Sequence, residues 1–468
     1  MTGLADLAGT GRPGSAAEAW PGPAGPWPPP GWFKEPPHPP APRRPVPHRP
    51  APHRPAPPRP APGPAQPGRL ARFAPSQLAW PWWLLWPWAL AWAALQARQA
   101  GLSWHFFAQG GQLLVGSGPG AGLQLYASHP ELQIGPLALA VAAVLRHLGP
   151  ASGEDTAVVA MSLTGPLMLA AVWRLLPAAE RGRPARLLLA GLLFLPVWAE
   201  LTTHYAHIDD LLALAFTVAG LHAVARQHPV WAGLAIAAAA DAKPWAAAFV
   251  AVLLALPRRQ WLTALVTFTG GVAAAWLPFL LTDPRTLAVT RFTIPNSQSS
   301  ALRVLGVMTA RTPPWDRLAQ LALGVAGGAL AVWRGRWQAA VLVAVAARIL
   351  LDPGVYAYYT AGALLGTILV DLVVARWQLP WATAAGAALL YAARFTHELV
   401  PFSLPELGLL RLVFAVGVPV LVLGLPGWWL IRRPGRHARP ARDAAAQHRD
   451  RAASSVIRER LACQELPV

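Results

Sequence analysis

Residues 204–216, HYAHIDDLLALAF, gather ionisable side chains at the start of an apolar helix. They include two histidines, His204 and His207, and two adjacent carboxylates, Asp209 and Asp210. Imidazoles and carboxylates act as general bases, and paired carboxylates also bind divalent cations. A charge inside a bilayer costs roughly 2.5–3.5 kcal/mol on insertion scales, so such groups are candidates for function. The alternative is that both acids only stabilise a helix N-terminus, at about 0.3–1 kcal/mol each.

The composition indicates what kind of protein must position these groups. The 468 residues are 54% hydrophobic and 13% charged, and they include 23 tryptophans, a residue that prefers the membrane interface. Apolar blocks separated by short loops are typical of a polytopic helical membrane protein. We predict an all-α transmembrane bundle of about 12 spans. We attribute the net charge of +18 to basic residues that fix the membrane topology and contact anionic lipid. No nucleic-acid partner is therefore expected.

Two segments rich in proline or arginine precede and follow the predicted bundle. Residues 1–76 contain the run RPVPHRPAPHRPAPPRPAPGPAQP, in which proline prevents regular secondary structure, so a disordered basic arm is predicted. The transmembrane domain is predicted over residues 77–431 and a basic tail over residues 432–468. The lone Cys463 excludes a disulfide framework within one chain.

Arginine-rich loops set the predicted topology. The positive-inside rule places these loops and both termini in the cytoplasm, provided that the apolar segment 132–148 does not cross. That segment is therefore predicted as a helix in the outer leaflet, within a large extracytoplasmic loop. The predicted spans lie near residues 79–97, 155–177, 185–202, 208–226, 229–242, 243–257, 259–281, 316–334, 337–351, 355–376, 380–394 and 407–431.

This topology brings polar residues from distant segments to the outer face of the membrane. Because hydrocarbon would reject each of them separately, we predict that they share a water-filled cavity. Lys243 lies at the tip of a short hairpin formed by residues 229–257, where its alternative role is to reach the headgroups. Arg348 and Asp352 are spaced for a local salt bridge, which is the alternative for that pair. The candidate site residues are His105, Glu131, His204, His207, Asp209, Asp210, Lys243, Arg291, Arg348, Asp352, Tyr358 and Tyr359.

Three stretches together resemble a known family. They are HIDDLLALAFTVAGLHAVARQHPVWAGLAIAAAADAKPWAAAF, WHFFAQGGQLLVGSGPGAGLQLYASHPELQIGPLALA and RILLDPGVYAYYTAG. In this order they resemble the GT-C glycosyltransferases that use polyprenyl-phosphate sugars, such as the mannosyltransferase-like membrane proteins of actinobacteria. The chain contains no Walker loop, HExxH or Cys/His metal spacing. The lack of a nucleotide site agrees with a donor carried by a lipid.

The resemblance implies a GT-C-like fold and an enzyme of the plasma membrane. It would transfer a mannose-like sugar, with inversion, from a polyprenyl-phosphate donor to an extracytoplasmic glycan or glycolipid of the cell envelope. Two alternatives are kept, a carrier or flippase of lipid-linked sugars and a non-catalytic membrane protein of the same fold.

The resemblance also suggests roles for individual residues. Such enzymes carry a key acid early in the first loop, where this chain has His105. The base is then His105, Glu131, Asp209 or Asp210, and we favour the two aspartates, which could also hold Mg or Mn as a cofactor. Phosphate contacts are expected from Lys243 and Arg348, with Arg291 as a weaker candidate; His204, His207, Asp352, Tyr358 and Tyr359 are expected to bind substrate.

Overall fold

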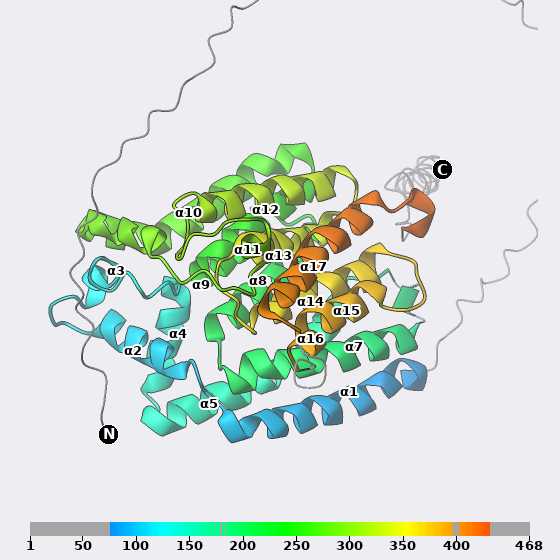
Figure 1. Cartoon of the computed structure of the whole chain (residues 1–468), viewed down its shortest axis with the longest axis horizontal. Helices are drawn as coiled ribbons and strands as arrows, with labels where there is room; N and C mark the ends of the chain where they lie inside the picture. The colour runs from blue at the N-terminus through cyan, green and yellow to red at the C-terminus, as the bar shows by residue number, and fades with distance from the viewer. Residues whose placement is uncertain (1–74, 178–179, 182, 396–401, 431–468) are drawn as a thin grey trace, which may run out of the picture. The chain divides into compact units, whose positions relative to one another are not determined.

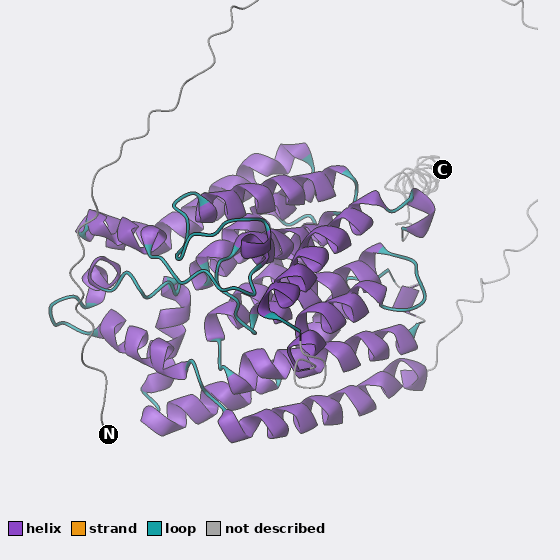
Figure 2. Ribbon diagram, in the orientation of Figure 1, coloured by secondary structure: helices purple, strands orange, loops and turns teal. Residues whose placement is uncertain are grey.

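The part of the chain that the structure describes consists of helices joined by loops, which confirms the predicted all-helical class. The computed structural model describes residues 75–177, 180–181, 183–395 and 402–430 (Figures 1 and 2). Within these ranges there is no strand, and only two isolated bridges occur, Pro295 with Arg311 and Ala375 with Leu430. The predicted Pro-rich arm and the basic C-terminal tail fall almost entirely outside the described residues.

Most helices begin and end within a few residues of a predicted span, but the predicted span 155–177 is divided into α5 and α6, α17 ends at Gly424 instead of residue 431, and α2, α3 and α11 match no predicted span. In chain order they are α1 (Pro75–Gln96), α2 (Trp104–Val115), α3 (Leu125–Ser128), α4 (Pro136–Arg146), α5 (Pro150–Ser162), α6 (Thr164–Arg174), α7 (Pro184–Ala199), η4 (Glu200–His204), α8 (Ile208–Ala225), α9 (Pro229–Ala242), η5 (Pro244–Ala255), α10 (Arg258–Thr282), η6 (Pro284–Arg291), α11 (Ala301–Val304), α12 (Asp316–Trp333), α13 (Ala340–Leu351), α14 (Tyr359–Leu369), η8 (Val370–Val374), α15 (Trp381–Gly386), η9 (Ala387–Ala392), α16 (Ala393–Phe395) and α17 (Leu404–Gly424). Several start with proline, whose fixed φ suits the first helical position.

Five helices of the described residues are long and apolar enough to cross a membrane. They are Ala151–Arg174, Pro184–His204, Ile208–Ala225, Arg258–Thr282 and Leu404–Gly424. The predicted count of about 12 spans is therefore not confirmed. Other predicted spans form apolar helices of 10–17 residues, which are short for a hydrocarbon layer of about 30 Å.

The hairpin predicted at Lys243 is present. α9 packs against α8, α10 and η5, and it ends where Lys243 takes an extended conformation with φ −143° and ψ 112°. Pro244 explains this break, because a residue before proline avoids the helical region. The break leaves Lys243 and the first residues of η5 at the end of α8 that carries Asp209 and Asp210.

The apolar segment 132–148 forms the short helix α4, so the predicted helix exists. α4 packs against α2 and α9, and Gly135 at its start lies so close to α9 that an added Cβ would be 2.0 Å from the carbonyl oxygen of Asp241. The first large loop is thereby held against the hairpin. Figure 1 shows α1 and α7 side by side along one edge of the bundle and α10 and α12 along the opposite edge.

Candidate active site

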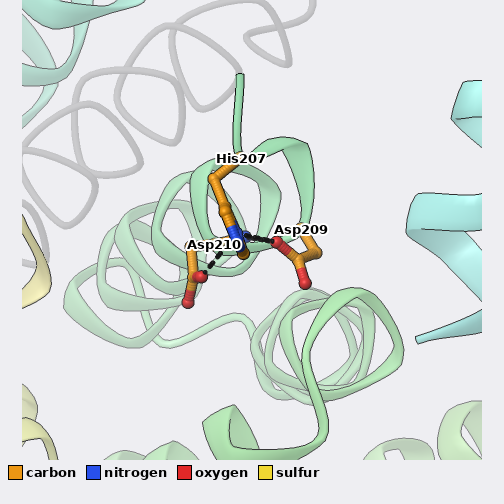
Figure 3. A group of neighbouring side chains, drawn as sticks. All are labelled: His207, Asp209 and Asp210. Atoms are coloured by element: carbon orange, nitrogen blue, oxygen red, sulfur yellow. Dashed lines mark hydrogen bonds and ion pairs between the residues drawn. The ribbon is translucent and has the colours of Figure 1, made fainter. Parts of the chain in front are cut away.

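Three ionisable side chains meet at the N-terminus of α8. The Nδ1 atom of His207 lies 2.6 Å from Oδ1 of Asp209 and 3.0 Å from Oδ2 of Asp210 (Figure 3). All three side chains are buried. The backbone N–H of Asp210 also donates to Asp209 at 2.8 Å. The two acids therefore do more than stabilise a helix N-terminus, since both contact the same imidazole.

Lys243 completes the cluster from the opposite hairpin. Its Nζ pairs with Oδ2 of Asp209 and lies 3.3 Å from Oδ2 of Asp210. Trp245, two residues later, donates its indole N–H to Asp210 at 3.2 Å. A buried ion pair loses much of its hydration, so it needs such additional contacts to be stable. We call His207, Asp209, Asp210 and Lys243 the charge cluster.

Arg348 and Asp352 form a second buried pair next to the charge cluster. Nε of Arg348 is 3.5 Å from Oδ2 of Asp352, so the i, i+4 salt bridge that was the alternative explanation is present. Arg348 also donates to the hydroxyl of Tyr359, and its guanidinium carbon lies 4.8 Å from the ring centroid of Trp245. Trp245 thus contacts both charged groups.

Tyr358 connects the two groups from another direction. Its ring stacks on that of His207 with the centroids 3.7 Å apart, and Nζ of Lys243 is 5.9 Å from the Tyr358 ring centroid. Residues from α8, the α9–η5 break and the end of α13 are therefore in direct or near contact. These segments are far apart in the sequence, so their proximity is a property of the fold.

A cavity of about 1030 Å³ adjoins both groups. Its volume is at the upper end of the range usual for small-molecule sites. Nine of the predicted site residues line it: Glu131, His207, Asp209, Lys243, Arg291, Arg348, Asp352, Tyr358 and Tyr359. The predicted convergence of polar side chains thus corresponds to one continuous space.

Three predicted residues do not line the cavity. Asp210 contacts the lining residues His207, Lys243 and Trp245. His105 is exposed, with its ring against that of Phe106. His204 is half-buried, and its ring packs edge-on against Tyr205. The roles suggested for these residues stay predictions.

The lining residues that were not among the predicted site residues include Gln133, Trp245, Asp316 and Arg317. Asp316 and Arg317 begin α12, directly after the second large loop. A charged pair at the outer end of a predicted span was the signal that could have identified them. Gln133 and Trp245 are neutral, and their sequence positions carry no comparable signal.

The ionisation of two loop residues reflects their surroundings. Burial alone would lower the pKa of His207, but the Asp209 carboxylate and the hydrogen bonds to both aspartates outweigh burial and raise that pKa. Burial raises the pKa of the Asp352 carboxyl, although Arg348 and the N–H of Gly354 act in the opposite direction. An imidazolium is thus favoured beside the two aspartates.

The charge cluster also contains the donor set of a metal site. Ligand atoms of His207, Asp209 and Asp210 lie within 4.8 Å of one another. However, Nζ of Lys243 contacts both carboxylates on the side where a cation would need to bind. The ammonium group already supplies the positive charge, so these residues do not fit a divalent ion while Lys243 is in place.

The described residues form a helical bundle with five helices long and apolar enough to cross a membrane and a large cavity that contains both acidic and basic groups. Residues 135–353 match the model of glycosyltransferase family 87. The matched segment includes Asp209, Lys243, Arg348 and Asp352. No curated protein and no solved structure matches the chain. The family match supports a membrane glycosyltransferase as the class of this protein.

Proposed function

We propose that the protein transfers a mannose-like sugar from a polyprenyl-phosphate donor to a cell-envelope acceptor on the extracytoplasmic side. One observation carries this proposal: the segment that matches the glycosyltransferase family also supplies most of the charged wall of the cavity. The volume of about 1030 Å³ leaves room for a sugar together with part of an acceptor.

The reaction requires a base, and its position must allow contact with the acceptor. The acceptor oxygen attacks the anomeric carbon, the bond from that carbon to the phosphate oxygen breaks, and the electron pair leaves with the phosphate. The hydroxyl proton passes to a carboxylate. Inversion in this single step needs no covalent sugar–enzyme intermediate.

The contacts favour Glu131 as this base. Its side chain is 52% exposed, lines the cavity and contacts only His129, with 3.2 Å between Nδ1 and Oε1. Asp209, in contrast, is fully buried and held by Lys243 and His207. The oxygens of Asp209 are thus already occupied by Lys243 and His207, which leaves no free oxygen to contact an acceptor hydroxyl. We therefore assign Asp209 and Asp210 to holding the charge cluster, and His207 and Tyr358 to the sugar-binding wall.

Transfer by the purified protein tests this proposal. The protein, reconstituted in lipid nanodiscs, is incubated with polyprenyl-phosphate mannose and a cell-envelope extract, and new glycosidic bonds are detected by mass spectrometry. A nucleotide sugar replaces the lipid donor in the control. We expect product with the lipid donor alone, and a rate lowered by about 10²-fold or more in Glu131→Gln and in Asp210→Asn. Transfer at the wild-type rate in both variants would contradict the proposed site.

Sidedness is tested separately through a single cysteine. Ser117 lies exposed in the loop between α2 and α3, and replacing Cys463 by serine removes the native thiol. We expect a membrane-impermeant maleimide to label Ser117→Cys in intact cells. Labelling that requires permeabilised cells would place the first large loop, and Glu131 with it, in the cytoplasm.

A further inference from the structure

The cations of the cavity wall differ in whether a carboxylate neutralises them. Lys243 pairs with Asp209 and Asp210, and Arg348 pairs with Asp352. Within the described residues, no carboxylate lies within 4.0 Å of the side-chain nitrogens of Arg291 or Arg317. Arg291 and Arg317 are therefore the lining cations whose donor groups no carboxylate occupies, although Asp316 and Asp352 lie near Arg317.

Arg317 and its neighbours also present unused hydrogen-bond donors. Nη2 of Arg317 donates to Oε1 of Gln133 and to the carbonyl of Phe292, both at 2.9 Å. Nε and Nη1 of Arg317 donate to no acceptor among the described residues, and Nε2 of Gln133 is buried without a partner there. Phe292 directly follows Arg291, so this bond joins Arg317 to the backbone next to Arg291, and both arginines line the cavity. A phosphate accepts several such charge-assisted bonds at once.

The cavity continues from these arginines into an apolar groove. α10 and α12 both pack on η5, and the groove between them is lined by Trp276 and Leu280 of α10, Ala248 of η5, and Leu318 and Leu321 of α12. Leu318 is 72% exposed, and only 11% of the apolar stretch of α10 is buried. This groove is therefore open on the outside of the helical bundle. An apolar surface that ends at two arginines without a contacting carboxylate is complementary to an amphiphile with an anionic head.

We propose that Arg317, with Gln133 and Arg291, binds the phosphate of the lipid donor, whose chain lies in the groove between α10 and α12. This proposal rests on the proposed function for the identity of the ligand. It assigns the phosphate to a place different from the paired cations Lys243 and Arg348. Those two hold the carboxylates of the site in position instead.

Binding without transfer tests this assignment. Reconstituted protein is titrated with a short-chain polyprenyl phosphate, with the corresponding polyprenol and with inorganic phosphate. We expect Arg317→Gln to weaken polyprenyl-phosphate binding by about 10- to 100-fold and to leave polyprenol binding unchanged. Arg317→Lys keeps the charge and should restore part of the affinity. The matched control is Arg311→Gln, which changes an exposed arginine of the neighbouring loop that does not line the cavity.

The groove has its own pair of variants on α12. Leu321→Trp fills the groove, whereas Leu323→Trp changes an exposed leucine of the same helix that does not line the cavity. We expect only Leu321→Trp to weaken both polyprenyl phosphate and polyprenol. Equal effects of the two tryptophans, or of the two arginine-to-glutamine changes, would overturn the assignment.

The two proposals fail in different ways. Suppose that the wild type binds polyprenyl phosphate in a manner that depends on Arg317 but transfers no lipid-linked sugar. That result would refute the proposed transferase activity and support the binding site. If the wild type transfers sugar and Arg317→Gln binds polyprenyl phosphate as tightly as the wild type, the proposed phosphate site is refuted and the proposed transferase activity is not. Strong binding of inorganic phosphate with no gain from the lipid chain would overturn the role of the groove.

Discussion

Removing the charge of Lys243 should destabilise the protein strongly. Lys243 is 9% exposed, and it faces two carboxylates that are at most 3% exposed. Lys243→Met keeps most of the side-chain volume but leaves Asp209 and Asp210 with His207 as the one remaining cationic partner of the charge cluster. Breaking a buried ion pair by removing one partner costs about 3–5 kcal/mol, and we expect a loss of this size in the free energy of unfolding.

A double-mutant cycle separates this effect from lost packing. Asp209→Asn in the background of Lys243→Met removes the uncompensated charge, so stability should partly recover, with a coupling energy of at least about 1.5 kcal/mol. Unfolding of the reconstituted protein at neutral pH supplies the four stabilities. The matched control is Arg285→Met, which removes the cation of the exposed pair with Asp283 and should leave stability unchanged because solvent screens that pair.

Two results would contradict an electrostatic role for Lys243. One is a Lys243→Met variant as stable as the wild type, which would mean that the charge cluster is hydrated. The other is a double variant no more stable than the single one, which would mean that packing rather than charge explains the loss. The same variants test the metal question: a divalent cation should stabilise Lys243→Met more than the wild type, since the ammonium group no longer competes for the carboxylates.

Three further predictions concern other parts of the structure. Glu131→Gln should lower the transfer rate by about 10²–10⁴-fold, whereas His105→Ala should have little effect because His105 does not line the cavity; initial rates in nanodiscs check both. Asp371→Ala should cost about 1–3 kcal/mol of stability, measured by unfolding, because this buried carboxylate accepts two backbone N–H bonds and one hydroxyl bond at the start of α15. Gly135→Ala should reduce the yield of folded protein through its clash with α9, and Gly270→Ala, with open space around it, should not.

The helical class and most helix boundaries could be predicted because they depend on local sequence. Apolar blocks show where a chain can be buried in lipid or in a bundle, and prolines such as Pro184 and Pro244 show where helices start. The number of membrane spans could not be predicted from local sequence. Hydropathy does not distinguish a helix that crosses the bilayer from a short one such as α13, which is buried by its neighbours along nearly its whole length.

The cost of a charge in hydrocarbon can be read from the amino-acid sequence, and it marked Asp209, Lys243 and Asp352 as candidate site residues. Which charges neutralise one another follows from the three-dimensional fold alone. Pairing depends on distances of a few ångströms between segments that are remote in the chain, and no spacing in the sequence encodes them. That pairing turned Lys243 from an expected phosphate ligand into the partner of two aspartates, and it left Arg317 as the cation with donors to spare.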